Sequence, residues 1–158
     1  MKMRSKLGAA FIISAVAAFS GCASPEQVAR IKAERAKVKS DLIASWPKAS
    51  VLCSDEKSCD KAFARAKVFV QEISNMKIQA SDDTMVITYN PIEYGDVGLS
   101  VTRMPEAGEG AVIKIQPVCR GLKSLEDIDS DITGIAANCA KKMAYINNNF
   151  KAYIAPGA

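Results

Sequence analysis

Histidine is absent from this chain of 158 residues. Its absence removes the commonest general base and metal ligand of proteins, and every catalytic arrangement in which histidine activates a serine or a cysteine. The phosphate-binding and hydrolase patterns GxxxxGK[ST], GxGxxG and GxSxG are also missing. The sequence therefore predicts a protein that is not an enzyme and that needs no cofactor or metal ion. A hydrolase that uses two carboxylates stays open as an alternative, because the separation that matters between them is spatial.

The chain also lacks an apolar run long enough to cross a bilayer. Its longest run, from Leu7 to Phe19, follows a start that contains Lys2, Arg4 and Lys6. As a helix this run would rise only about 20 Å, whereas the hydrocarbon core of a membrane is about 30 Å thick. A charged start followed by a short apolar segment is typical of a secretory signal peptide. We therefore expect residues 1–21 to be removed during export.

The apolar run ends in Phe19-Ser20-Gly21-Cys22, where two small residues precede a cysteine. This end resembles the lipobox of the bacterial lipoproteins, with phenylalanine in place of the usual leucine at the first position. The resemblance implies that Cys22 becomes the first mature residue and carries a diacylglyceryl group and a further acyl chain such as palmitate. Two or more acyl chains would make the attachment to the membrane effectively permanent. The alternative is an ordinary secretory signal, which would leave Cys22 as an unpaired thiol.

The residue after the modified cysteine helps to select the membrane in bacterial lipoproteins. Ala23 stands at this position, in place of the aspartate that is linked to retention in the inner membrane. The resemblance therefore implies that the protein is anchored in the cell outer membrane and faces the periplasm. The inner membrane and the cell surface are the other locations that the sequence leaves open.

The mature chain has the size of one domain and almost no net charge. Removal of Lys2, Arg4 and Lys6 would lower the 21 basic residues of the precursor to 18, against 17 acidic ones. This balance gives no indication of nucleic-acid binding. We divide the mature chain into residues 22–45, which hold the lipid anchor and a basic helix or stalk, and residues 46–158, which form the folded domain.

Four cysteines follow Cys22, and an even number of cysteines in an exported chain predicts disulfide bonds. Three pairings are possible; we favour Cys53 with Cys59 and Cys119 with Cys139. The first pair would close a short local loop, and the second would join the end of a strand to a helix. Zinc binding by the four thiolates is the rival interpretation, but the spacing lacks the paired CxxC of zinc sites.

The first helix is expected to begin at Ser24-Pro25-Glu26 and to end near Ser45, before Trp46-Pro47. Its apolar stripe is thin, which is typical of a stalk. Its exposed face carries five basic residues, which are Arg30, Lys32, Arg35, Lys37 and Lys39. These residues are a candidate binding site for anionic lipid head groups or for cell-wall polymer. The alternative is a solvated helix face with no binding role.

The remaining sequence predicts an α+β fold. Apolar residues recur three and four apart between 58 and 75, which indicates a helix, and the period then changes to two. We expect three or four antiparallel strands, covered on one face by helices, with the other face exposed to water or to a partner. The residues expected on the covered face are Met85, Ile87, Leu99, Val101, Ile113 and Ile115, and those expected on the exposed face are Thr88, Ser100, Thr102, Lys114 and Gln116.

A long last helix is expected to start near Ser124 and to run to about Tyr153. Gly134 within it indicates either close packing or a short break. The sequence as a whole favours an interaction or structural module that holds a partner protein or a cell-wall component near the outer membrane. The second interpretation is a module that binds a small ligand or a lipid between the sheet and the last helix.

Overall fold

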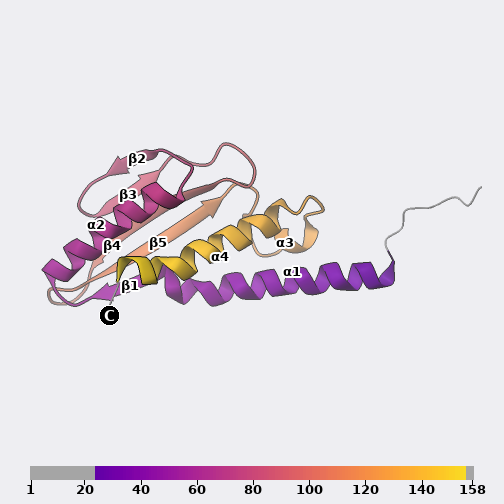
Figure 1. Cartoon of the computed structure of the whole chain (residues 1–158), viewed down its shortest axis with the longest axis horizontal. Coiled ribbons are helices and arrows are strands. Elements are labelled where there is room, and N and C mark those ends of the chain that lie inside the picture. The colour runs from indigo at the N-terminus through magenta and orange to yellow at the C-terminus, as the bar shows by residue number, and fades with distance from the viewer. Residues whose placement is uncertain (1–23, 156–158) are drawn as a thin grey trace, which may run out of the picture.

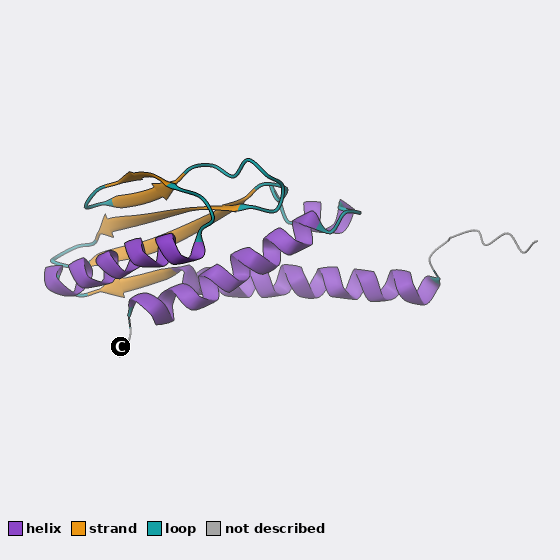
Figure 2. Ribbon diagram, turned by 45° about the horizontal axis from the view of Figure 1, so that its top comes forward, coloured by secondary structure: helices purple, strands orange, loops and turns teal. Residues whose placement is uncertain are grey.

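The computed structural model describes residues 24–155; the predicted signal peptide and Cys22 lie outside the described residues. All the described helices lie on one side of a five-stranded antiparallel sheet of order β1-β5-β4-β3-β2 (Figures 1 and 2). The elements are α1 (Pro25–Ser45), η1 (Trp46–Ala49), β1 (Ser50–Cys53), α2 (Glu56–Ile73), β2 (Ile78–Ser81), β3 (Met85–Thr88), β4 (Val97–Pro105), β5 (Ala111–Cys119), α3 (Asp127–Ser130) and α4 (Ile135–Ile154). The predicted α+β class is confirmed.

The sheet contains one strand more than the three or four expected. The additional strand is β1, which pairs with the first half of β5, so that Leu52 lies opposite Val112. β1 is four residues long and follows Pro47 and η1 directly. A run this short shows too little alternation to be distinguished from a loop by its sequence.

The side chains of β3 face the opposite way from the prediction. Val86 and Thr88 are buried under the helices, whereas Met85 and Ile87 lie on the other face. Val86 pairs with the buried Val101 of β4, and residues paired in this way share a face. The prediction was wrong because a strand that is apolar on both faces does not reveal which face is covered, and a shift of one residue inverts every side chain.

The main core lies between the sheet and the two helices α2 and α4. Phe69 of α2 meets Phe150 of α4 edge to face, with ring centroids 5.5 Å apart. Ile113 and Ile115 of β5 close the core from the sheet side, and all four side chains are almost completely buried. This packing confirms that the C-terminal helix covers one face of the sheet.

The predicted last helix is interrupted. α3 ends at Ser130 and α4 begins at Ile135. Gly134 lies between them with φ of 78°, in the left-handed region that favours glycine. Gly134 therefore marks a break, which was one of its two expected roles. The break also places Ile132 in a loop, where its side chain is 94% exposed.

α1 is only partly a stalk. A second apolar cluster joins its C-terminal half to α4, where Val38 and Leu42 pack beside three alanines, Ala136, Ala140 and Ala144. Alanines spaced four apart form a smooth stripe along α4, which lets α1 approach closely. Residues 35–45 therefore belong to the packed domain, and an independent stalk that ends at Ser45 is not what the structure shows. The first turns of α1 project beyond α3 (Figure 1).

The structure contains both of the predicted disulfide bonds. Cys53–Cys59 joins the end of β1 to the first turn of α2, with Cα atoms 5.3 Å apart. Cys119–Cys139 joins the end of β5 to α4, with Cα atoms 5.6 Å apart. The second bond ties the sheet to the helix that covers it, so both staples hold the helices to the sheet.

Candidate functional site

One face of the sheet carries no helix among the described residues, and we call it the open face. The strand register places twelve side chains on it. They are Ser50, Leu52, Ala80, Met85, Ile87, Ser100, Thr102, Met104, Val112, Lys114, Gln116 and Val118. Ser100, Thr102, Lys114 and Gln116 were expected there and are found there; Thr88 was expected there and lies on the covered face.

An apolar row crosses the open face at one end. Leu52, Val112 and Met104 are cross-strand neighbours on β1, β5 and β4. Directly paired side chains of this kind have Cβ atoms about 5 Å apart, so the three form one continuous surface. The Leu52 side chain is 71% exposed and that of Met104 is 43% exposed. Sequence analysis missed this row because it missed β1, which supplies Leu52.

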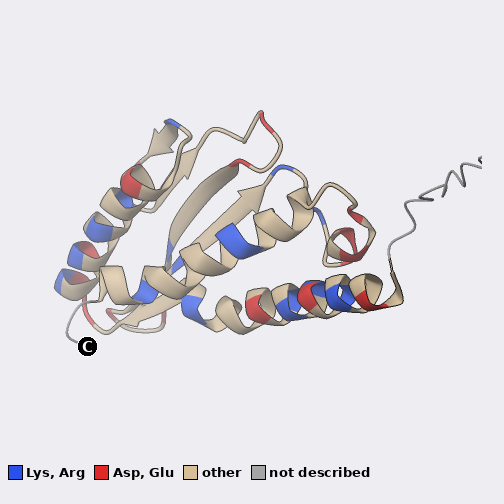
Figure 3. Cartoon of the chain, turned by 45° about the vertical axis from the view of Figure 1, so that its right-hand side comes forward, with Lys and Arg blue, Asp and Glu red and all other residues tan. Residues whose placement is uncertain are grey.

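The open face is also poor in charge. Lys114 is the one charged residue among its twelve side chains. Figure 3 shows the contrast: blue and red ribbon is concentrated on the helices, while the strands are mostly tan. Protein interfaces are depleted of charge at their centre and enriched in residues such as methionine. A nearly uncharged face with an apolar row is therefore a candidate protein-binding surface.

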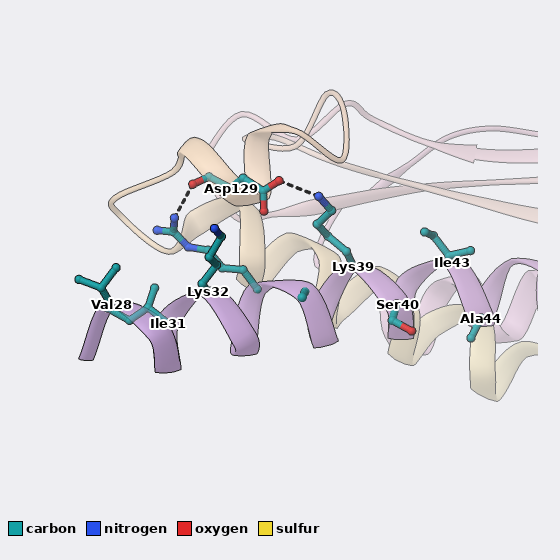
Figure 4. Close-up of a pocket in the computed structure, with 10 residues that line it drawn as sticks. Val28, Ile31, Lys32, Lys39, Ser40, Ile43, Ala44 and Asp129 are labelled. Atoms are coloured by element: carbon teal, nitrogen blue, oxygen red, sulfur yellow. Dashed lines mark hydrogen bonds and ion pairs between the residues drawn. The ribbon is translucent and has the colours of Figure 1, made fainter. Parts of the chain in front are cut away.

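The five basic residues of α1 do not share one exposed face. Arg35 turns toward α3 and donates hydrogen bonds to the backbone carbonyls of Asp129 and, at 2.6 Å, Asp131. Lys39 forms an ion pair of 2.7 Å with the carboxylate of Asp129 (Figure 4). Positively charged side chains stabilise the C-terminus of a helix, where backbone carbonyls lack partners within the helix, and these contacts are made at the C-terminus of α3. Arg35 and Lys39 therefore hold the fold together.

The other three basic residues point in two directions. With 3.6 residues per turn, Arg30 and Lys37 lie on the side of α1 opposite to Arg35. Lys37 pairs with Asp41 on its own helix at 2.6 Å. Lys32 lies on the side of Arg35 and lines an open groove with Val28 and Ile31 (Figure 4). The structure therefore divides the predicted basic site instead of assembling it.

Arg35→Met is expected to lower the free energy of unfolding by about 1–2 kcal/mol, because hydrogen bonds from a charged group to the end of α3 are lost. Lys37→Met is the matched control on the same helix, and its exposed ion pair is worth about 0.5 kcal/mol at most. Urea unfolding followed by the fluorescence of Trp46 measures both. Equal losses in the two variants would show that Arg35 does not hold α3.

Two carboxylates, Asp127 and Asp131, line one hollow beside Tyr94 and Arg120. Hydrogen bonds from the backbone N–H groups of Ser124 and Lys123 lower the pKa of Asp127. The Thr133 hydroxyl and the N–H of Ala136 lower the pKa of Asp131. A glycosidase needs one carboxyl group with a raised pKa to act as a general acid. Both carboxyl groups are held ionised instead, in positions that cap local turns.

The space between the sheet and α4 is filled by side chains of the core. Phe69, Phe150, Ile113 and Ile115 meet there with almost no exposed surface. A ligand at this place would have to displace packed side chains. The core packing therefore argues against a small apolar ligand at the centre of this space. An open hollow of about 460 Å³ lies at its edge, lined by Ile73 of α2, Val97 of β4 and Ile146 of α4 among others, and it is the place where such a ligand would fit.

Within residues 24–155, no helix combines the length and the apolar character needed to span a membrane. The open face, with Leu52, and the projecting start of α1, with Val28 and Ile31, both expose large apolar side chains. Comparison with protein-family models, with curated proteins and with solved structures gave no match.

Proposed function

We propose that the protein is a lipoprotein of the bacterial outer membrane, anchored through Cys22, whose domain binds a partner protein in the periplasm without catalysing a reaction. The observation that carries this proposal is the open face, with its apolar row of Leu52, Val112 and Met104 and its single charge at Lys114. Exposed apolar surface of this kind costs free energy in water and is typical of a binding surface.

The open face suits a folded partner better than a soluble ligand. The open face is a sheet surface with no helix over it among the described residues, and its one charge, Lys114, lies in the middle rows opposite Thr102. An apolar partner surface would cover the neighbouring apolar row and exclude water from it. The polar side chains in its middle rows, Ser100, Thr102 and Gln116, offer hydrogen bonds that fix the register of such a partner. The preferred partner is therefore a protein with an apolar and weakly charged surface.

The first helix is the weaker candidate for partner binding. Arg35 and Lys39 use their charges inside the molecule, on α3. The charge of Lys37 is neutralised by an ion pair with Asp41 on the same helix. These contacts account for three of the five basic residues within the molecule, and they favour the open face as the place where a partner protein binds.

Crosslinking in intact cells tests the proposal. A photoreactive benzoylphenylalanine in place of Leu52 is expected to form a covalent adduct with one envelope protein, and the same group in place of Tyr145 is expected to form none. Tyr145 is the matched control because its side chain is 59% exposed but lies on the helical side, on α4. Immunoblotting followed by mass spectrometry measures the adducts.

A second variant makes the result specific. Met104→Glu places a charge in the apolar row, next to Val112. It is expected to reduce the adduct at position 52 at least about tenfold, since covering a carboxylate with an apolar partner surface costs more than about 1.4 kcal/mol. Tyr145→Glu is expected to leave the adduct unchanged. Identical adducts at positions 52 and 145, or an adduct at 52 that Met104→Glu does not weaken, would contradict binding at the open face.

A further inference from the structure

Large apolar side chains are exposed together at the end of the domain from which α1 projects. They are Val28 and Ile31 on α1, Ile92 and Tyr94 in the loop between β3 and β4, and Ile132 in the loop between α3 and α4, and we call them the anchor-end patch. Figures 1 and 2 both show these two loops at the same end of the molecule as the start of α1. The open face is a separate surface.

A shared hollow and one hydrogen bond link the three segments that carry this patch. Tyr94 lines a hollow together with Asp131 and Thr133, on either side of Ile132. The Asp131 carbonyl accepts a hydrogen bond from Arg35. Val28 and Ile31 precede Arg35 by two turns and by one turn on the same side of α1. The patch side chains therefore lie at one end of the molecule, on three segments that are far apart in the sequence, with the contact between Arg35 and Asp131 linking α1 to the loop that carries Ile132.

The loop geometry turns Ile132 outward. The Asp131 carboxylate accepts hydrogen bonds from the backbone N–H groups of Thr133 and Ala136, which closes a tight turn before α4. The Ile132 side chain is left 94% exposed at the tip, and that of Ile92 is 73% exposed at the tip of its own loop. Single apolar residues on a surface are ordinary, but several on the loop tips at one end indicate a contact with an apolar phase.

The position of the proposed lipid anchor indicates that this apolar phase is the membrane. Ser24 caps α1 through a hydrogen bond from the N–H of Gln27 to its hydroxyl. Only Ala23 separates Ser24 from Cys22, and two residues span at most about 7 Å. A lipid on Cys22 would therefore hold the first turns of α1 at the membrane surface. Lys32, which is exposed on the same side of α1 as Val28 and Ile31, would lie at the level of lipid phosphates.

We propose that the anchor-end patch lies in the interface of the bilayer that holds Cys22, with α1 inclined to the surface, as a second and non-covalent attachment to the membrane. This inference rests on the lipid anchor of the proposed function. Tyrosine is enriched at the interface of membranes because its ring is apolar and its hydroxyl is polar, as Tyr94 would be here. The inclined orientation keeps the domain from rotating freely about its anchor, so the open face is presented in a defined direction.

Quenching by brominated lipids tests the contact in the full lipidated protein. Trp46 is the single tryptophan of the chain, so Trp46→Phe gives a background into which Ile132→Trp is introduced. Leu52→Trp in the same background is the matched control, since it is a highly exposed aliphatic position on the open face. Both proteins are reconstituted in vesicles of phosphatidylethanolamine and phosphatidylglycerol, with and without bromine on the acyl chains.

Bromine is expected to reduce the emission of the tryptophan at 132 at least roughly twofold, because interfacial side chains lie about 5–10 Å into the boundary of head groups and acyl chains. The emission of the tryptophan at 52 is expected to stay within about a tenth of its value without bromine, because that position lies in water. Equal quenching at the two positions in protein that floats with the vesicles would overturn the inference and leave the anchor intact. Protein that does not float would refute the anchor itself, and the inference with it.

Discussion

Phe150→Ala is expected to lower the free energy of unfolding by about 3–5 kcal/mol, as large-to-small changes of a buried aromatic residue do. The Phe150 ring has no exposed surface and meets Phe69 edge to face at 5.5 Å. Removal of the ring leaves a cavity where α4 meets α2 and the sheet, and all three elements lose the contacts that they made with it. Urea unfolding should show a lower midpoint with an unchanged slope.

The matched control for Phe150 is Tyr145, one and a half turns earlier on the same helix. Its side chain is exposed and makes no part of the core, so Tyr145→Ala should change stability by about 0.5 kcal/mol at most. A loss below about 1 kcal/mol in Phe150→Ala, or a loss in Tyr145→Ala of the same size, would mean that α4 does not cover the sheet as described. A domain of this size has about 5–15 kcal/mol of stability in total, so the expected loss is a large part of it.

The elements that could be predicted from the sequence are those with long and one-sided patterns. The spacing of Phe63, Ala66 and Val70 indicated α2, and the stripe that includes Phe150 indicated α4, because a helix with one buried face repeats its apolar residues three and four apart. The disulfide pairs could be predicted as well. A short local loop favoured Cys53 with Cys59, and a link from the end of a strand to a helix favoured Cys119 with Cys139.

The features that sequence analysis missed depend on contacts between distant segments. β1 exists because β5 supplies its pairing partners. Four residues are too few to show the alternation of apolar and polar side chains that predicts a strand. The facing of β3 is set by the pairing of Val86 with Val101. Arg35 and Lys39 look like surface residues in the sequence, and only the fold brings Asp129 beside them, from 94 and 90 positions away. The candidate site was affected most, because its apolar row requires Leu52 on β1.

Cys22→Ser is expected to remove the protein from the outer-membrane fraction almost completely. The diacylglyceryl group of bacterial lipoproteins is attached through sulfur, and serine offers none. Each buried methylene contributes about 0.8 kcal/mol to membrane attachment, so the loss of whole acyl chains far exceeds what the anchor-end patch alone can replace. Separation of the two membranes on a density gradient, followed by immunoblotting, measures the distribution.

Ala23→Ser is the matched control for this change. It alters the neighbouring residue by one oxygen, keeps the sulfur of Cys22, and introduces no aspartate; the outer-membrane fraction is therefore expected to be unchanged. A Cys22→Ser protein that remains in the outer membrane in the same amount as the unaltered chain would show that the acyl chains are not what holds it there.

The mass of the N-terminal peptide of the protein purified from bacterial membranes tests the anchor most directly. We predict a peptide that begins at Cys22 and carries a diacylglyceryl group together with an acyl chain on its amino group. A peptide that begins at another residue, or one that begins at Cys22 with a free thiol, would contradict the anchor and the proposed place of the domain in the envelope.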